Sequence, residues 1–303
     1  MKPPLSRVTR RALTGLAIGA AGLLAAGCGS GASSGAAAGS GASSAPAQAQ
    51  GAATATANLP AGALGQSGTT RFCSDISSPP LEFYANGQQP TGSDIDLGNA
   101  LAAKLGVKAE WENTAFAGII PALQAGHCDA ILSQLLDKPA RRATVNFVDY
   151  MNSSEAIMVR KGNPRHVTGL SSLCGLSVAA ETGTTVASFL ATQSKSCTAS
   201  GKKPIAVQTF LRDSDALSQL GLGHVDAYGT TVETGGYDIS KNNEMFELAG
   251  PPFGQIATGI ATIKKNTALH GALASAFAAL QQDGTYKQIM TKWGLGPDEL
   301  KQG

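Results

Sequence analysis

Apolar and polar positions along residues 69–134 alternate between the patterns of strands and helices. The predicted strands are residues 69–75 (TTRFCSD), 107–113 (VKAEWEN) and 128–134 (CDAILSQ), and the predicted helices are residues 93–106 and 116–126. The second strand alternates apolar and polar positions, whereas the first helix repeats leucine at i, i+4 spacing. This strand–helix–strand–helix–strand order predicts a parallel sheet with helices on its faces.

The helix predicted over residues 93–106 carries start and stop signals. Ser93 is the predicted N-cap, with Asp96 three residues later as in a capping box. Gly106 supplies the expected end of the helix. The residues before it, 76–92, are predicted to form a loop and turn.

The same order of elements restarts in the second half of the chain. A strand, a Gly-rich turn and a helix are predicted within residues 175–193, strands at 203–210, 225–231 and 258–266, and helices at 214–223, 273–280 and 286–293. Two such units, with crossovers near residues 157–162 and 258–264, predict an α/β fold of two lobes around a cleft. A ligand is expected beyond the carboxyl ends of the strands, at the interface of the lobes.

These patterns divide the folded body into three segments. Residues 69–160 are the predicted first part of lobe 1, residues 161–257 are lobe 2, and residues 258–303 return to lobe 1. About 235 residues suit two lobes of ordinary size. The formal net charge of +2 is nearly neutral, which argues against nucleic-acid binding as the main task.

Residues 1–27 are predicted to be an export signal. A basic start is followed by an apolar run over residues 13–26, which is shorter than the roughly 20 residues that a membrane-spanning helix needs. The run ends at Cys28, and LLAAGC resembles a bacterial lipobox, in which the cysteine thiol receives a lipid. TRRAL at residues 9–13 also resembles a twin-arginine signal. The alternative is an ordinary signal peptide, with Cys28 incidental.

Residues 28–68 are the predicted tether. The tract after Cys28 consists mainly of Gly, Ser, Ala and Thr, contains no charged residue, and cannot bury enough surface to offset its ordering entropy. We therefore expect a disordered segment that holds the folded body near the outer surface of the membrane. Because one acyl chain binds a bilayer only marginally, several chains are expected on the lipid anchor.

The chain has five cysteines, and four remain when Cys28 is set aside. An even number in an exported protein suggests disulfides, with three possible pairings. We favour Cys73 with Cys128 and Cys174 with Cys197, because each pair falls within one predicted lobe. Buried free thiols are the alternative. No CxxC motif or histidine spacing indicates a metal site, and no cofactor is expected.

Six motifs follow one another in an order typical of a known family: GSDIDLGNALAAKLGVK, FAGIIPALQAGHCDAILS, KPARRATVNFVDYMNSS, VAAETGTT, LGLGHVDAY and LQQDGTYKQIMTKWG. Over residues 70–294 the chain resembles the solute-binding proteins of ABC importers for polar amino acids. The resemblance implies a type II periplasmic-binding-protein fold and a binding protein rather than an enzyme. It also implies capture of a small polar or zwitterionic solute outside the cell membrane, for delivery to an ABC permease and ATPase complex.

The resemblance also implies a set of ligand-binding residues. Arg141 stands where the family holds the ligand α-carboxylate, a role that suits the guanidinium fork, although the adjacent Arg142 could exchange places with it. The family's G-T-T turn falls at Gly183, Thr184 and Thr185, where backbone N–H groups and hydroxyls can receive the same carboxylate. The remaining members of the expected set are Phe116 as an apolar wall, Ser133, Asp75 and Thr231.

The chain departs from the family pattern in the ammonium half of the site. Thr231 stands where the family commonly has an aspartate, and Glu233 could substitute for it. Leu136 replaces a hydroxyl, and Ser78 replaces an aromatic residue. Three acidic residues are candidates by position for holding a cation: Asp75, Glu82 and Glu155. We therefore hypothesise that the ligand need not be a standard α-amino acid.

Two other functions fit the same fold. One is a dehydratase acting on cyclohexadienyl acids, although Glu155, Glu181 and His224 are scattered in the sequence and suggest no acid–base pair. The other is a lipoprotein sensor that presents its ligand to a membrane partner. Product release from prephenate or arogenate would favour the first, and the genes beside this one would separate sensing from import.

Overall fold

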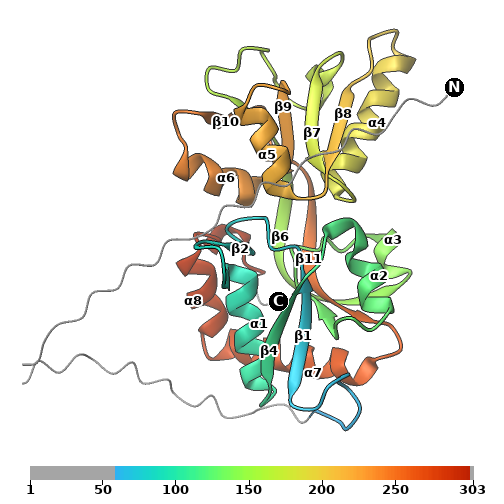
Figure 1. Cartoon of the computed structure of the whole chain (residues 1–303), viewed down its shortest axis with the longest axis vertical. Helices are drawn as coiled ribbons and strands as arrows, with labels where there is room; N and C mark the ends of the chain where they lie inside the picture. Colours follow the sequence, from blue (N-terminus) through green and yellow to red (C-terminus); the bar gives the residue numbers. More distant parts are fainter. Residues whose placement is uncertain (1–58, 301–303) are drawn as a thin grey trace, which may run out of the picture. The chain divides into compact units, whose positions relative to one another are not determined.

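The computed structural model describes residues 59–300. The predicted signal peptide, Cys28 and residues 28–58 of the predicted tether lie outside this part of the chain. Figure 1 shows the described elements coloured along the sequence.

The described residues form strands and helices in the expected alternation. The strands are β1 (Thr69–Ser74), β2 (Phe83–Tyr84), β3 (Pro90–Thr91), β4 (Lys108–Asn113), β5 (Ala130–Ile131), β6 (Val145–Arg160), β7 (Ser177–Glu181), β8 (Ala206–Phe210), β9 (Ala227–Thr231), β10 (Phe246–Leu248) and β11 (Phe253–Ile263). The helices are α1 (Ser93–Lys104), α2 (Ile119–Gln124), α3 (Pro139–Arg142), α4 (Thr185–Ala199), α5 (Asp213–Gly221), α6 (Val232–Lys241), α7 (Thr267–Gln282) and α8 (Thr285–Lys292), with short 3-10 turns η1 (Phe116–Gly118), η2 (Leu170–Leu173) and η3 (Gly296–Asp298).

One mixed sheet joins two groups of strands. Its order is β4-β1-β5-β11-β6-β9-β7-β8, with β10 paired to β6. We call β4, β1 and β5 with α1, α2, α7 and α8 lobe 1, and β9, β7 and β8 with α4, α5 and α6 lobe 2. β1 pairs in parallel with β4 and β5, and β7 pairs in parallel with β8 and β9, which confirms the predicted parallel units.

β6 and β11 pass through both lobes, as Figure 1 shows. They pair with each other in antiparallel register, and the part of β6 from Glu155 to Val159 also pairs with β9. β6 therefore joins the lobe 2 strands earlier in the chain than the crossover expected near residues 157–162. This arrangement brings the carboxyl ends of the parallel strands in each lobe to the same cleft.

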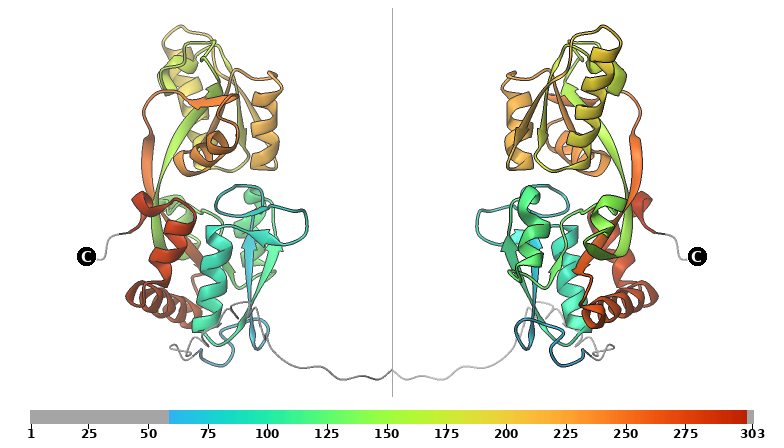
Figure 2. Two further views of the ribbon diagram at one scale, coloured as in Figure 1. Left: turned by 90° about the vertical axis from the view of Figure 1, so that its left-hand side faces the viewer. Right: turned by 90° about the vertical axis from the view of Figure 1, so that its right-hand side faces the viewer.

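Apolar side chains cover both faces of the lobe 1 strands. Phe72 on one face of β1 packs in a cluster with Leu101 of α1 and Leu273 of α7. Cys73 on the opposite face packs with Ile119 of α2. Figure 2 shows α1, α7 and α8 gathered on one side of these strands and α2 on the other. This is the two-faced burial that a parallel sheet requires.

The ordered fold begins earlier than the sequence suggests. Residues 59–68, assigned above to the disordered tether, lie against lobe 1. Ala63 is 4% exposed, and Leu59 and Leu64 pack against the same apolar cluster. Asn266 donates from Nδ2 to the Ala63 carbonyl at 2.8 Å. The tether was predicted too long at this end, because these scattered apolar residues find partners only in the folded body.

The predicted N-cap of α1 is wrong. Gly92 occupies the cap position and no side chain caps the helix, which already includes Ser93. The N–H groups of Ser93 and Asp94 instead donate to the carbonyls of Pro80 and Leu81, both at 2.9 Å. A Cβ at Gly92 would lie 1.9 Å from the Leu81 oxygen, so this close backbone approach requires glycine.

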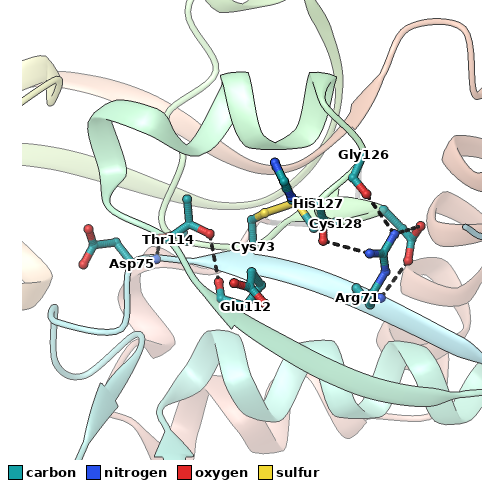
Figure 3. Close-up of a disulfide and its surroundings, with 10 residues drawn as sticks. Arg71, Cys73, Asp75, Glu112, Thr114, Gly126, His127 and Cys128 are labelled. Carbon is teal, nitrogen blue, oxygen red and sulfur yellow. Dashed lines mark hydrogen bonds and ion pairs between the residues drawn. A yellow bond between two sulfur atoms is a disulfide. The ribbon is translucent and has the colours of Figure 1, made fainter. Parts of the chain in front are cut away.

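Each lobe contains one disulfide. The structure pairs Cys73 with Cys128 and Cys174 with Cys197, which is the predicted pairing. Figure 3 shows the first bond beside Arg71, whose guanidinium donates to the carbonyls of Gly126 and His127. These contacts fix the loop before β5, and β5 in turn positions the residues that follow it in the cleft.

The pattern did not predict α6, which follows β9 directly. Its sequence VETGGYDISK contains two adjacent glycines, which have low helix propensity. Close packing against neighbouring strands accounts for one of the glycines: a Cβ at Gly235 would lie 3.0 Å from Leu248 and 3.2 Å from Thr230. Across residues 59–300, no helix is both long enough and apolar enough to cross a membrane.

Candidate ligand-binding site

A cavity lies where the two lobes face each other. It comprises about 490 Å³ of space outside the atoms, part of which is open to solvent. Lobe 1 contributes the residues after β5, the turn η1 and the loop around Glu82, and lobe 2 contributes the ends of β7 and β9 and the starts of α4 and α5. The position agrees with the rule that ligands of such sheets lie beyond the strands' carboxyl ends.

The lining of the cavity is strongly acidic. Its acidic residues are Glu82, Glu155, Glu181 and Asp213. Among the described residues, no Lys, Arg or His side chain lines it. Sequence reasoning named Glu82 and Glu155 as candidates, treated Glu181 as scattered from them, and missed Asp213. The available signal was topological, since Glu181 ends a predicted strand and Asp213 lies directly before a predicted helix.

Glu155 is the acidic residue on the strand shared by both lobes. Its side chain is buried at 1% exposed. Burial, with a smaller contribution from the nearby Glu233 carboxylate, raises its pKa to about 8, against the opposing effects of Lys138 and Arg141. Glu155 is therefore largely protonated near neutral pH when no cation is bound beside it.

Glu181 and Asp213 lie together on the lobe 2 side. Burial raises the pKa of Glu181, and the Asp213 and Asp75 carboxyls add to the increase. Burial also raises the pKa of Asp213, while the hydrogen bond from the Tyr228 hydroxyl lowers it. Within residues 59–300, Glu181 Oε1 has no hydrogen-bond partner.

Glu82 is the acidic residue on the lobe 1 side of the cavity, and Ser133 is hydrogen-bonded to it. Ser133 donates from Oγ to Glu82 Oε1 at 3.0 Å, and it accepts from the Asp75 N–H at 2.8 Å. Burial raises the pKa of Glu82, and the neighbouring Asp94 adds to the effect. Ser133 also lines the cavity, but its hydroxyl already bridges the Asp75 N–H and the Glu82 carboxyl.

Arg141 lies beside the cavity rather than in its lining. It is 9% exposed, and its guanidinium donates to the Leu136 carbonyl at 2.8 Å and to the Gly183 carbonyl of lobe 2 at 3.3 Å. Its Cζ lies 5.3 Å from the centre of the Phe116 ring, which does line the cavity. Burial lowers the pKa of Arg141 to about 10, so it stays charged at neutral pH.

The neighbouring Arg142 points elsewhere. It is exposed and donates through Nε and Nη2 to the buried carboxylate of Asp137. The two arginines, which sequence reasoning left as interchangeable, therefore have different surroundings. Only Arg141 lies between the lobes.

The G-T-T turn leads into α4. Thr184 is the N-cap, and its Oγ1 accepts from the Ala187 N–H at 3.3 Å and donates to the Glu181 carbonyl at 2.8 Å. Thr185 lines the cavity at 5% exposed, and within residues 59–300 its Oγ1 has no partner. Gly183 has a φ of 85° and lies against Ala117 of lobe 1. A Cβ at Gly183 would be 3.0 Å from the Cα of Ala117.

Asp75 is buried but does not line the cavity. Its carboxylate accepts from the Ser77 hydroxyl at 2.7 Å, from the Phe116 N–H at 2.7 Å and from Arg212 Nη1 of lobe 2 at 2.8 Å. Arg212 also donates to Asn113 Oδ1 at 2.8 Å. The Asp75 carboxylate is thus occupied by protein donors from both lobes.

Thr231 also lines the cavity and is the N-cap of α6. Its Oγ1 accepts from the Thr234 N–H at 3.3 Å and from Gln134 Nε2 at 3.2 Å. The same Gln134 nitrogen reaches Glu233 Oε2 at 3.1 Å, so Glu233 is held by lobe 1 rather than facing the cavity. Gln134, which sequence reasoning missed, follows β5 and joins the two lobes.

Two other departures from the family pattern, and one residue weighed for the enzyme alternative, have clear positions. Leu136 and Ser78 both line the cavity, so the sites of the replaced hydroxyl and aromatic residue belong to it. His224 is exposed and contacts Gln219 at 2.9 Å, away from this lining.

The arrangement of the lobes around the cavity is typical of one class of protein. Two lobes joined by shared strands present polar groups to one cavity between them, which suits a binding protein. In the described part of the chain, no group of three or more His, Cys, Asp or Glu is arranged to hold a metal ion.

Comparison with known proteins supports the same class. The pattern of the bacterial extracellular solute-binding proteins, family 3, matches residues 70–296. The chain is 28% identical to the arginine-binding protein ArgT of Corynebacterium glutamicum over 236 residues, which cover 77% of this chain and 76% of that protein.

Two solved structures extend the likeness. An ancestral arginine-binding protein bound to arginine is 33% identical, with a TM-score of 0.69 over 75% of this chain and 98% of the other. An ancestral amino-acid-binding protein described as a precursor of cyclohexadienyl dehydratase is 30% identical, with a TM-score of 0.65 over 75% of this chain and 95% of the other.

The chain therefore belongs to family 3 of the bacterial extracellular solute-binding proteins. Its structural neighbours have the type II periplasmic-binding-protein fold, as expected. Its curated relatives are amino-acid-binding proteins rather than enzymes.

Proposed function

We propose that this protein captures an amino acid or amino-acid derivative outside the cell and delivers it to an ABC importer. The single observation that carries the proposal is the polar cavity lined from both lobes, which lies at the carboxyl ends of the strands. A solute in this position would contact both lobes and favour the state in which they are together.

The carboxylate of the solute is assigned to the region of Arg141 and Thr185. Arg141 has five N–H donors, and the two bonds to backbone carbonyls leave donors for a ligand. Thr185 offers a buried hydroxyl at the N-terminus of α4, where the helix dipole favours an anion. Phe116 would form the apolar wall beside them.

The delivery step rests on family membership and on the leader. We propose that residues 1–27 direct export, that Cys28 carries the lipid, and that the following tract lets the body reach a permease. The folded body would be divided on β6 just before Glu155, where the pairing with β9 begins, and near residue 257 on β11.

A ligand screen by thermal unfolding tests the binding function. The purified protein is heated with amino acids, quaternary amines, opines and small carboxylates. A ligand at 100 times its dissociation constant should add about 2.7 kcal/mol to the free energy of unfolding. Failure of every compound to raise the unfolding temperature would contradict the proposal.

A dehydratase remains a second candidate because of Glu155. With a pKa raised to about 8 by burial, it could donate a proton to a leaving hydroxyl near neutral pH. The acidic lining opposes a substrate with two carboxylates such as prephenate, so we rank this function second. Steady release of product from prephenate or arogenate by the purified protein would reverse the ranking.

A further inference from the structure

We propose that Glu181 and Asp213 form a subsite for a positively charged group at the far end of the ligand. This inference rests on the proposed binding function and adds the charge class of the solute. The ligand would be an amino acid or derivative with a cationic side chain, its guanidinium or ammonium held on the lobe 2 side of the cavity.

The first observation is the placement of the two carboxyls. Both line the cavity, although Glu181 is only 4% exposed and Asp213 only 7% exposed. Glu181 ends β7 and Asp213 begins α5, so rigid elements position both of them.

The second observation is the unsatisfied oxygen of Glu181. Within residues 59–300, Glu181 Oε1 has no hydrogen-bond partner although it is buried. A buried polar atom in this condition costs free energy unless a ligand or water contacts it. A residue that lines a cavity and carries a carboxyl oxygen without a protein donor is suited to accept from a ligand N–H.

Several acidic groups and one cation lie near Glu181 and Asp213. Asp75 from lobe 1, Asp238 from α6 and the Tyr228 hydroxyl from β9 are the neighbouring acidic groups that affect this pair. Arg212 is the nearby cation, and its Nη1 is bound to Asp75 and Asn113. The acidic groups around the pair therefore outnumber the nearby cation.

The cation is organic rather than a metal. No group of three or more acidic or metal-binding side chains in the described residues is arranged to hold a metal ion. A planar guanidinium can donate to two carboxylates at once, and an ammonium can do so with three N–H groups.

Binding at this subsite would release protons. Burial and mutual repulsion raise the pKa of Glu181, so the pair retains a proton in the free protein. A cation between the carboxyls favours their charged forms and expels that proton. A neutral ligand of the same shape would leave it in place.

Arginine and citrulline provide the test, because citrulline has nearly the same shape but an uncharged side chain. We expect calorimetric titration of the purified protein at pH 7 to give roughly 10- to 100-fold tighter binding of arginine, the range expected for charged hydrogen bonds. Repeating the arginine titration in phosphate and in Tris, whose ionisation enthalpies differ, should reveal the released protons.

Three variants locate the effect. Glu181→Gln and Asp213→Asn should each reduce the preference for arginine over citrulline by roughly tenfold or more. Asp215→Asn is the matched control, because Asp215 is exposed in the first turn of the same helix and should keep the original preference. Circular dichroism and thermal unfolding check that each variant is folded.

The outcomes are separable from those of the proposed function. Tight binding of a neutral amino acid without preference for arginine would overturn the subsite and leave the binding function intact. An arginine preference that persists in both folded variants would also overturn it. If neither variant folds, the wild-type protein alone provides the test. Absence of its preference for arginine over citrulline, or of proton release on arginine binding, overturns the subsite. If no amino acid binds, both proposals fail together.

Discussion

Asp75 and Glu181 occupy comparable places in the two lobes. Asp75 directly follows β1 and Glu181 is the last residue of β7, so each stands at the carboxyl end of a parallel strand. Both are buried, at 1% and 4% exposed. Donors from both lobes surround the Asp75 carboxylate, whereas Glu181 Oε1 has no partner in residues 59–300.

The difference shows that residue type and topological position do not fix the role of a buried acid. Asp75 accepts from Arg212 and so links the lobes, whereas Glu181 faces the cavity. The supply of donors nearby, which depends on contacts far apart in sequence, separates the two. Substitutions in each lobe test this distinction.

Replacing Asp75 and Glu181, one at a time, by the matching amide should give the largest difference in the free energy of unfolding. Asp75→Asn should lower the free energy of unfolding by about 3 kcal/mol, because it removes the charged partner of Arg212 and replaces one of the two acceptor oxygens with an amide donor. Glu181→Gln should cost little or even stabilise the free protein, since a neutral amide is easier to bury. Urea unfolding at pH 7 measures both changes, and equal losses would erase the contrast.

Replacing Arg141 tests the lobe 1 end of the site. Arg141→Lys should weaken binding of an amino acid by roughly 100-fold, because lysine cannot present a guanidinium fork to a carboxylate. Arg142→Lys is the control, since Arg142 is exposed and bound to Asp137. It should change affinity by less than about threefold. Calorimetry on both variants compares them, and a larger loss for Arg142 would exchange their roles.

The pH dependence of stability tests Glu155, the acid shared by both lobes. Its pKa is raised from 4.5 to about 8 by burial, so the folded protein holds a proton that the unfolded chain has lost within this window. Stability is therefore greatest at the acidic end and decreases as pH rises. Glu155 alone should lower the free energy of unfolding by about 2 kcal/mol between pH 5.5 and pH 7.5 without ligand. Glu181, Asp213 and Asp238, whose pKa values burial also raises, add to this decrease. If the free energy of unfolding of Glu155→Gln decreases with pH as steeply as that of the wild type, Glu155 does not contribute to the decrease.

The smallest expected effect concerns the cap of α6. Thr231→Ala removes the side chain that accepts from the Thr234 N–H and should cost about 1 kcal/mol. Thr231→Ser keeps the hydroxyl and should cost less than half as much. Thermal unfolding compares them. Equal stability of all three proteins would mean that the cap adds nothing to lobe 2.

Local pattern was sufficient to predict most of the fold. Alternation in β4, leucine spacing in α1 and their order along the chain indicate the parallel units without any long-range information. The pattern could not predict α6, because its adjacent glycines oppose a helix that packing against Leu248 then stabilises. It also misjudged the start of α1, where the backbone of residues 80–81 replaces a side-chain cap.

The candidate site was less accessible to sequence reasoning. Motif register brought Arg141, Phe116 and the turn at Thr184 to attention, and the structure places them in or beside one cavity. The same register could not reveal that Asp75 is occupied by Arg212, a residue 137 positions away. Asp213 was missed although its position directly before a predicted helix was a usable signal, because its neighbours Glu181 and Tyr228 are distant in sequence.

The paired course of β6 and β11 has a consequence for engineering and evolution. Asn152 on β6 lies opposite Ala257 on β11, so the chain leaves for lobe 2 and returns from it on neighbouring strands. In topological terms lobe 2 is a cassette inserted into a hairpin of lobe 1. A tight turn joining these strands would close lobe 1 without it, and foreign domains could be exchanged at the same two points.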